Sequence, residues 1–185
     1  MTRNEFPQPA PYEPAALRGR RTLFRGEVNR GKTELLSRIL GAFLEAGETD
    51  LAVLDMAPDL MRGVGGKMRP PRGNAVRYFA TMIHPPRLSG RTPDETRILA
   101  EGNARRLEML FDRLAERPAA VLLINDVSIY LQAAGPDRLM ELVGRSPTVV
   151  MNGYWGLSLG GGELGTREHD NMRVLAAACH RVVDL

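Results

Sequence analysis

Apolar residues recur along the chain with two different spacings, and these spacings predict where helices and strands lie. A period near 3.6 residues places apolar side chains on one face of a helix. It predicts helices at about residues 32–46, 94–116, 136–143 and 166–179. Short unbroken apolar runs bounded by turn residues are typical of buried strands. They predict strands at about residues 21–25, 51–55, 76–83, 120–126, 148–152 and 181–185.

The helix expected over residues 94–116 has the clearest start signal in the chain. Thr92 is a candidate N-cap, and Pro93 suits the first helical position. Glu95 completes a capping box, in which a side chain at each end of the first turn satisfies a free backbone N–H.

Strands and helices alternate along the sequence, and this alternation predicts the fold class. We expect a three-layer α/β fold, in which a mainly parallel sheet is covered by helices on both faces. A chain of 185 residues suits one domain, which we place at residues 20–185. Residues 1–19 are rich in proline and are expected to form an extended arm before it.

One strand–loop–helix unit carries a specific motif. Residues 26–33 read Gly-Glu-Val-Asn-Arg-Gly-Lys-Thr, which matches the phosphate-binding loop G-x-x-x-x-G-K-T (the P-loop, or Walker A motif). Such a loop turns its backbone N–H groups toward phosphate, and the following helix adds the positive end of its dipole. The residues expected to bind nucleotide are therefore Gly26, Glu27, Val28, Asn29, Arg30, Gly31, Lys32 and Thr33. Of these, Lys32 would contact the β- and γ-phosphates, and the Thr33 hydroxyl would bind Mg²⁺.

A P-loop site also needs an acid that holds Mg²⁺, usually at the carboxyl end of a hydrophobic strand. Asp126 follows the apolar run that ends at Asn125, so we assign it to the metal together with Thr33. Its alternative role is to cap the segment after it. Asp55 ends another strand and is the rival acid. It could contact an acceptor substrate, act as its base, or form a turn before Pro58.

Two further polar residues lie next to the ends of predicted elements. Asn152 ends the strand over 148–152 and could orient the group that attacks the γ-phosphate, with an Asn-Gly turn as the alternative. Arg167 begins a helix after a glycine-rich segment and could act as an arginine finger, with a solvated first-turn arginine as the alternative. The candidate catalytic residues are Lys32, Asp55, Asp126 and Arg167.

Composition narrows the class of protein. A hydrophobic content of 43% and a charged content of 25% are typical of soluble globular proteins. No apolar run is long enough for a membrane helix, so we expect no membrane association. Cys179 is the single cysteine and cannot form an internal disulfide, and a cytoplasmic location is expected. The three histidines are scattered and form no zinc pattern.

The formal net charge of +3 hides an uneven distribution. The stretch 62–91 has no acidic residue, and its basic residues are Arg62, Lys67, Arg69, Arg72, Arg77, Arg87 and Arg91. This stretch could bind an anionic small molecule or nucleic acid, or it could be a solvated loop. Its aromatic residues are only Tyr78 and Phe79, which weighs against binding of single-stranded nucleic acid.

With the P-loop, the Asp126 strand and the alternating elements, the chain resembles P-loop NTPases over roughly residues 20–185. This resemblance implies ATP and Mg²⁺ as ligands. GTP is less favoured, because the sequence lacks Asn-Lys-x-Asp and Asp126 is not followed by x-x-Gly. The regions Asn152–Tyr154 and Arg167–Asn171 are similar to the end of adenosylcobinamide kinase/guanylyltransferase. The order of Asp55 and the basic loop is similar to that of polynucleotide 5′-hydroxyl kinases.

Two functions of different classes follow from these features. The first is an ATP- and Mg²⁺-dependent phosphotransferase or ATPase that acts with an anionic acceptor, bound partly by residues 57–75. The second is a nucleotide-binding switch or assembly module with little turnover, favoured by the absence of a glutamate after Asp126. A nucleic-acid-binding protein that uses the stretch 62–91 is a third reading. A homo-oligomer is compatible with each of them.

Overall fold

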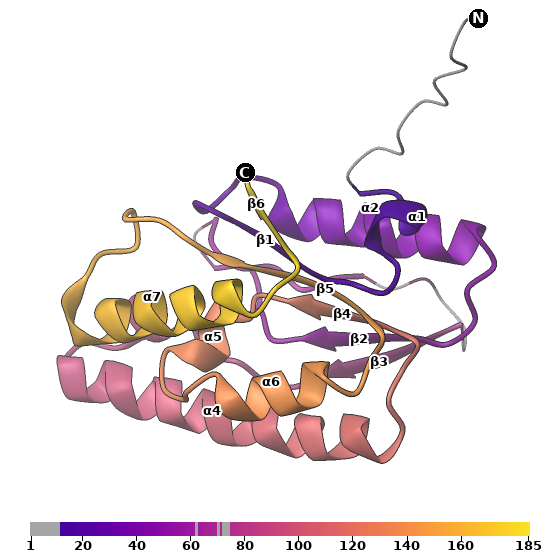
Figure 1. Cartoon of the computed structure of the whole chain (residues 1–185). Coiled ribbons are helices and arrows are strands. Elements are labelled where there is room, and N and C mark those ends of the chain that lie inside the picture. Colours follow the sequence, from indigo (N-terminus) through magenta and orange to yellow (C-terminus); the bar gives the residue numbers. More distant parts are fainter. Residues whose placement is uncertain (1–11, 62, 70, 72–74) are drawn as a thin grey trace, which may run out of the picture.

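A parallel β-sheet forms the middle layer of the structure, with helices packed on both of its faces (Figure 1). The computed structural model describes residues 12–61, 63–69, 71 and 75–185. Within these residues the sheet has six strands, in the order β3-β2-β4-β5-β1-β6. They are β1 (Arg21–Gly26), β2 (Leu51–Asp55), β3 (Val76–Ala80), β4 (Val121–Asn125), β5 (Thr148–Tyr154) and β6 (Arg181–Asp184). Every pairing is parallel, so the carboxyl ends of the strands share one edge of the sheet.

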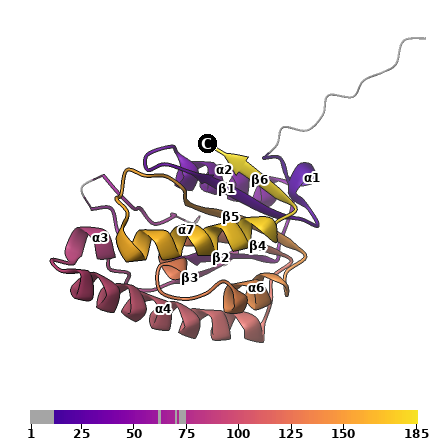
Figure 2. The same cartoon turned by 60° about the vertical axis from the view of Figure 1, so that its left-hand side comes forward.

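The helices divide between the two faces of this sheet. They are α1 (Pro14–Leu17), α2 (Lys32–Glu45), α3 (Pro86–Ser89), α4 (Pro93–Glu116), α5 (Ser128–Leu131), α6 (Asp137–Val143) and α7 (Gly162–Ala177). Figure 2 shows α1 and α2 on one side, and α4, α6 and α7 on the other. None of the helices in the described part of the chain is long and apolar enough to cross a lipid bilayer.

Strand β4 shows how both faces of the sheet are buried. Leu122 and Ile124 belong to the apolar cluster that includes residues of α4 to α7. Val121 and Leu123 belong to the cluster on the opposite face, with residues of α1 and α2. Successive side chains of a strand point to opposite faces, so a strand covered on both sides is apolar throughout. This is why the strands appear in the sequence as unbroken apolar runs.

The predicted fold class is confirmed: the structure is a three-layer α/β fold with its elements in the predicted order. Two boundaries differ from the predicted ones by more than two residues. β3 ends at Ala80 rather than near residue 83, and α7 begins at Gly162 rather than near residue 166. Glycine is a poor helix former, so the first turn of α7 gives no helical signal in the sequence. The predicted N-cap of α4 is confirmed, because the backbone N–H of Glu95 donates to Thr92 Oγ1 at 3.1 Å, whereas the Glu95 carboxylate accepts from the N–H of Arg91 at 2.8 Å rather than from that of Thr92.

The expected extended arm is wrong for residues 14–17, which form the single helical turn α1. Pro14 begins this turn, a position where proline's missing N–H costs nothing. Leu17 is fully buried in the cluster that contains α2, so apolar burial fixes the turn against the domain. Residues 1–11 lie outside the described part of the chain, and the division into an arm and a domain stays a prediction.

Candidate nucleotide-binding site

The predicted P-loop joins β1 to α2, which is the context that the motif requires. Gly31 precedes α2 with a φ of 71°, a left-handed conformation that glycine adopts without a steric penalty. Gly26 ends β1, where an added Cβ would lie 2.6 Å from the carbonyl oxygen of Leu185. Both motif glycines are therefore required by the local backbone.

Lys32 and Thr33 open α2 and line the cavity above the strand ends. Lys32 Nζ donates to the carbonyl oxygen of Gly26 at 2.8 Å and also to that of Glu27. Burial lowers the pKa of Lys32, although the nearby carboxylates of Asp126 and Glu27 act in the opposite direction. The amine is thus partly stripped of water before any anion arrives, which strengthens its attraction for phosphate.

Asn125, at the end of β4, joins the P-loop to two neighbouring strands. Its Oδ1 accepts a hydrogen bond from Thr33 Oγ1 and another from Asn152 Nδ2, both at 3.1 Å. Its Nδ2 donates to Asp55 Oδ1 at 2.9 Å. In the sequence, the apolar run before Asn125 indicates only that this residue belongs to a strand. Its place just before Asp126, at the carboxyl end of a buried strand, is the signal that could have identified it.

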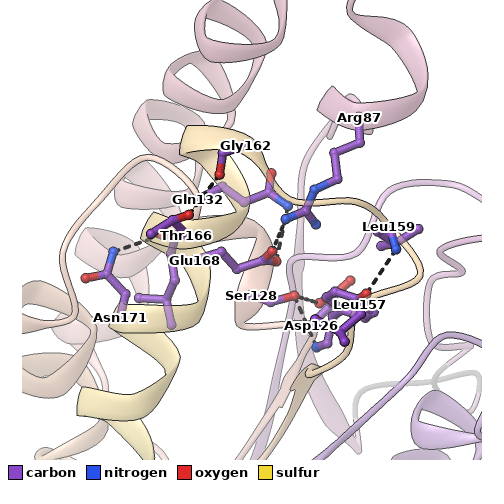
Figure 3. A network of polar contacts seen from close by, with 12 residues as sticks. Arg87, Asp126, Ser128, Gln132, Leu157, Leu159, Gly162, Thr166, Glu168 and Asn171 are labelled. Carbon is purple, nitrogen blue, oxygen red and sulfur yellow. Dashed lines mark hydrogen bonds and ion pairs between the residues drawn. The ribbon is translucent and has the colours of Figure 1, made fainter. Parts of the chain in front are cut away.

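Asp126 follows Asn125 in the chain and lines the cavity. Its backbone is left-handed, with a φ of 61°. Its N–H donates to Asn152 Oδ1 at 2.7 Å, and Ser128 Oγ donates to its carboxylate (Figure 3). Burial raises the pKa of Asp126, and the Ser128 hydrogen bond and the Lys32 charge only partly oppose this effect. The structure therefore brings eight of the predicted site residues to one cavity: the six P-loop residues from Val28 to Thr33, with Asp126 and Asn152.

Asp55 has a different environment from Asp126. Its side chain is fully buried and does not line the cavity. Its oxygens accept hydrogen bonds from Ala57 N (3.1 Å), Asn125 Nδ2 (2.9 Å), Met68 N (2.6 Å) and Tyr78 OH (2.7 Å). These four donors fix the segment that follows β2 against the sheet, so the contacts of Asp55 are those of a positioning residue.

The cavity has a volume of about 340 Å³ and extends well beyond the P-loop. Such a volume lies within the range of small-molecule sites. Its far wall comes from α3, α5 and α7 and carries a buried ion pair between Arg87 and Glu168. Gln132 Nε2 also donates to Glu168 Oε1, at 3.3 Å (Figure 3). Burial raises the pKa of Glu168, and the charge of Arg87 and its hydrogen bond partly oppose this rise.

Among the described residues outside the P-loop, Arg87 rather than Arg167 is the arginine that lines the cavity. Arg167 is exposed and lines neither this cavity nor the second one, described below. Arg87 was noted in the sequence only as one member of the basic stretch. Its ion-pair partner lies 81 positions further along the chain, so no local pattern could have revealed the pair.

The described basic residues of the stretch 62–91 do not gather at one site. Lys67 Nζ donates to the carbonyl oxygens of Ala57 (2.7 Å) and Thr81 (3.0 Å). Arg77 pairs with Asp50 at 2.9 Å, near the amino-terminal edge of the sheet, opposite to the cavity. Arg69 and Arg91 are exposed. Arg62 and Arg72 lie outside the described residues.

Glu27 ties the P-loop to the segment that follows β5. Its carboxylate accepts hydrogen bonds from the backbone N–H groups of Leu157 (2.6 Å) and Ser158 (3.1 Å) and from the Ser158 hydroxyl. Led by the Ser158 hydroxyl, these donors lower the pKa of Glu27 to about 2. Gly156 allows this approach, because a Cβ there would lie 2.1 Å from the Glu27 carboxyl group. We call this set of contacts the Glu27 clasp.

The parallel sheet, with a P-loop between β1 and α2, defines a P-loop NTPase-like α/β fold. Among solved structures, the flagellar accessory protein FlaH from Methanocaldococcus jannaschii is similar, with a TM-score of 0.57 and 12% sequence identity. The match covers 91% of this chain and 71% of that chain. The Pif1 helicase from Candida albicans matches with a TM-score of 0.37 and 15% identity, over 90% of this chain and 36% of that one. No known protein family and no curated protein matches the sequence. The likeness to FlaH shows the fold alone.

Proposed function

We propose that the protein binds a nucleoside triphosphate with Mg²⁺ at the P-loop and transfers its terminal phosphoryl group, with ATP favoured over GTP. One observation carries this proposal: Lys32, Thr33, Asp126 and Asn152, which come from three separate parts of the chain, line one cavity. Phosphoryl transfer depends mainly on positioning and on neutralising charge, rather than on covalent chemistry by the protein. The residues gathered here suit that task.

The donors present fit Mg²⁺, which prefers oxygen ligands and is commonly held by one or two protein groups together with phosphate oxygens and water. The Thr33 hydroxyl and the Asp126 carboxylate both line the cavity and would hold it. When bound, Mg²⁺ neutralises charge on the phosphates. Asn125 fixes the Thr33 hydroxyl, and Asn152 fixes the backbone of Asp126. Lys32 would leave the P-loop carbonyl oxygens for the β- and γ-phosphates.

We further propose that the attacking group belongs to an acceptor and that Asn152 or Asp126 orients it. The support is the length of the cavity, which continues past Asp126 to Pro85, Ile129 and Gln132. A site for water alone would not need this extension. Among the described basic residues of the stretch 62–91, Arg87 lines this cavity, and its charge is the reason to propose an anionic acceptor. Hydrolysis by water is the second outcome of the same site.

A switch or assembly module with little turnover is the alternative function. It is favoured by the Glu27 clasp, which connects the P-loop directly to the glycine-rich segment 156–162. A nucleotide that moves the P-loop would therefore move this segment as well. Segments that change order with the state of a nucleotide are a common way for such proteins to signal.

The products formed from Mg–ATP separate these functions. The wild type is incubated with Mg–ATP alone and with a set of phosphorylated and unphosphorylated alcohols, and ADP and inorganic phosphate are measured. ADP together with phosphate indicates an ATPase, and ADP with a new phosphate ester indicates a kinase. Binding without ADP formation indicates the switch. The Lys32→Ala variant is the blank for contaminating enzymes. Failure of the wild type to bind Mg–ATP would overturn the proposal.

A further inference from the structure

The ion pair between Arg87 and Glu168 forms a partition between two cavities. Arg87, Tyr154 and Glu168 line both the cavity at the P-loop and a second cavity of about 260 Å³. The second cavity lies under the glycine-rich segment after β5 and the start of α7, beside Trp155 and His169. In Figure 3 the Arg87 guanidinium points from α3 to the Glu168 carboxylate on α7. The contact therefore closes one cavity from the other.

This partition is well buried, but its hydrogen bonds are incomplete. The side chains of Arg87 and Glu168 are 13% and 4% exposed. Arg87 Nε is buried and has no hydrogen-bond partner among the described residues, and the same holds for Gln132 Oε1. A buried donor without a partner is costly, particularly in a charged group. The pair therefore has a donor left over for a ligand that enters the cavity.

Because of its negative charge, phosphate is the ligand best suited to compete with Glu168 for Arg87. Among the described residues that line the P-loop cavity, the cations are Arg30, Lys32 and Arg87. Arg87 is the one of these outside the P-loop and α2, and it lies near enough to Asp126 for its charge to lower the pKa of that residue against the effect of burial. The guanidinium fork matches the oxygens of phosphate as well as those of a carboxylate. The buried Glu168 carboxylate would in turn repel a phosphate unless Arg87 lay between them.

We propose that Arg87 exchanges Glu168 for the γ-phosphate when a nucleoside triphosphate occupies the P-loop, and that this exchange opens the partition between the two cavities. Arg87 is then the residue that distinguishes a triphosphate from a diphosphate. Glu168, left without its arginine, keeps the hydrogen bond from Gln132, and the first turns of α7 loosen. This exchange requires that a nucleotide binds at the P-loop, as proposed above.

The test compares the affinities of Mg–AMP-PNP and Mg–ADP, measured by titration calorimetry. Arg87→Gln should weaken Mg–AMP-PNP binding by about 10- to 100-fold and leave Mg–ADP within about twofold. Glu168→Gln removes the competing carboxylate, so it should strengthen Mg–AMP-PNP binding by about 3- to 10-fold. Arg138→Gln is the matched control. It breaks an exposed ion pair with Asp112 that lies outside both cavities, and it should change neither affinity.

Arg87→Gln leaves a buried carboxylate unpaired and could fail to fold. The double variant Arg87→Gln/Glu168→Gln removes both charges, so neither is left buried without a partner, and it should also lose the preference for the triphosphate. Hydrogen exchange gives an independent reading, since residues 162–170 should exchange faster with Mg–AMP-PNP than with Mg–ADP. If the wild type binds both nucleotides and the double variant keeps the same ratio of AMP-PNP affinity to ADP affinity, the proposed exchange is overturned while the nucleotide site stands. Absence of binding by the wild type would overturn the nucleotide site itself.

Discussion

Asp55 and Asp126 both lie at the carboxyl ends of buried strands, but their different surroundings suit these identical side chains to different roles. Asp126 faces the cavity and holds one hydroxyl, whereas Asp55 is enclosed by four donors. A carboxylate with four donors has no free lone pairs of suitable geometry to offer a ligand. The burial that raises the pKa of Asp126 adds a second difference, because it would make the proposed metal binding at Asp126 sensitive to pH.

Mg²⁺-dependent nucleotide binding should weaken as the pH falls through the raised pKa of Asp126, because only the ionised carboxylate holds the metal. The folded state takes up this proton more readily than the unfolded state. The nucleotide-free protein should therefore gain stability over the same fall in pH, down toward the ordinary aspartate value of 3.8. Titration of Mg–AMP-PNP at successively lower pH in wild type and Asp126→Asn measures this effect. A pH step that persists unchanged in the variant would assign it to another group.

Asp55→Asn should destabilise the fold by about 3 kcal/mol, because an amide cannot accept from all four donors and turns its own N–H groups toward some of them. Urea denaturation measures the loss. Asp59→Asn, in the exposed part of the same loop, is the control and should stay within about 0.5 kcal/mol of wild type. If Asp55→Asn folds with full stability but loses Mg²⁺-dependent activity, Asp55 and Asp126 have exchanged roles.

The site residues that the sequence could identify are those that belong to a local pattern. The P-loop has a fixed spacing, and Asp126 and Asn152 each follow an apolar run; P-loop residues 28–33 and both of these polar residues are found in the cavity wall. Arg87 and Glu168 follow no such rule, because their pairing depends on how α3 and α7 pack above the sheet. Asp55 and Asp126 have the same local signal, and only the surrounding donors distinguish them.

At the scale of elements, the Glu27 clasp holds the segment that follows β5 against the P-loop. Glu27→Gln should loosen this segment and speed hydrogen exchange at Leu157 and Ser158, because an amide is a weaker acceptor than a carboxylate. The pKa of Glu27 in the folded protein, about 2, lies below the ordinary glutamate value of 4.5. The stabilising effect of the clasp is therefore present above about pH 4.5 and is lost as the pH falls through about 2.

Amide exchange measured by mass spectrometry near neutral pH tests the clasp. Glu163→Gln, an exposed acid in the first turn of α7, is the control and should leave exchange at residues 157 and 158 unchanged. Equal exchange in wild type and Glu27→Gln would show that the backbone of the segment, rather than the carboxylate, holds it in place.

Element prediction succeeded where a pattern extended over several turns or a whole strand. α2 and α4 have apolar faces long enough to show a helical period, and the central strands are apolar throughout. The helices α1, α3 and α5 have four residues each, which is about one turn and too short for any period to appear. Tertiary contacts fix these turns, as the buried Leu17 shows for α1.

In the whole molecule, strand order explains why one edge of the sheet collects the polar residues. β5 lies between β1 and β4, so Asn152 stands between the P-loop and Asp126. The sequence predicts parallel strands and therefore a shared polar edge, but it does not predict which strands are neighbours. The neighbours decide that Asn125 contacts Thr33, Asn152 and Asp55 at the same time.

Binding of a nucleoside triphosphate at the P-loop is the basis of every functional step described above. Titration calorimetry of Mg–AMP-PNP into wild type and Lys32→Ala tests it most directly, with thermal unfolding as the check on folding. The hydrogen bonds that the Lys32 amine makes within the described residues go to P-loop carbonyl oxygens, so its loss should leave the melting temperature nearly unchanged. The affinity should fall about tenfold or more, because a charged partner of the phosphates is removed. Equal affinities in the two proteins would contradict a nucleotide site at the P-loop.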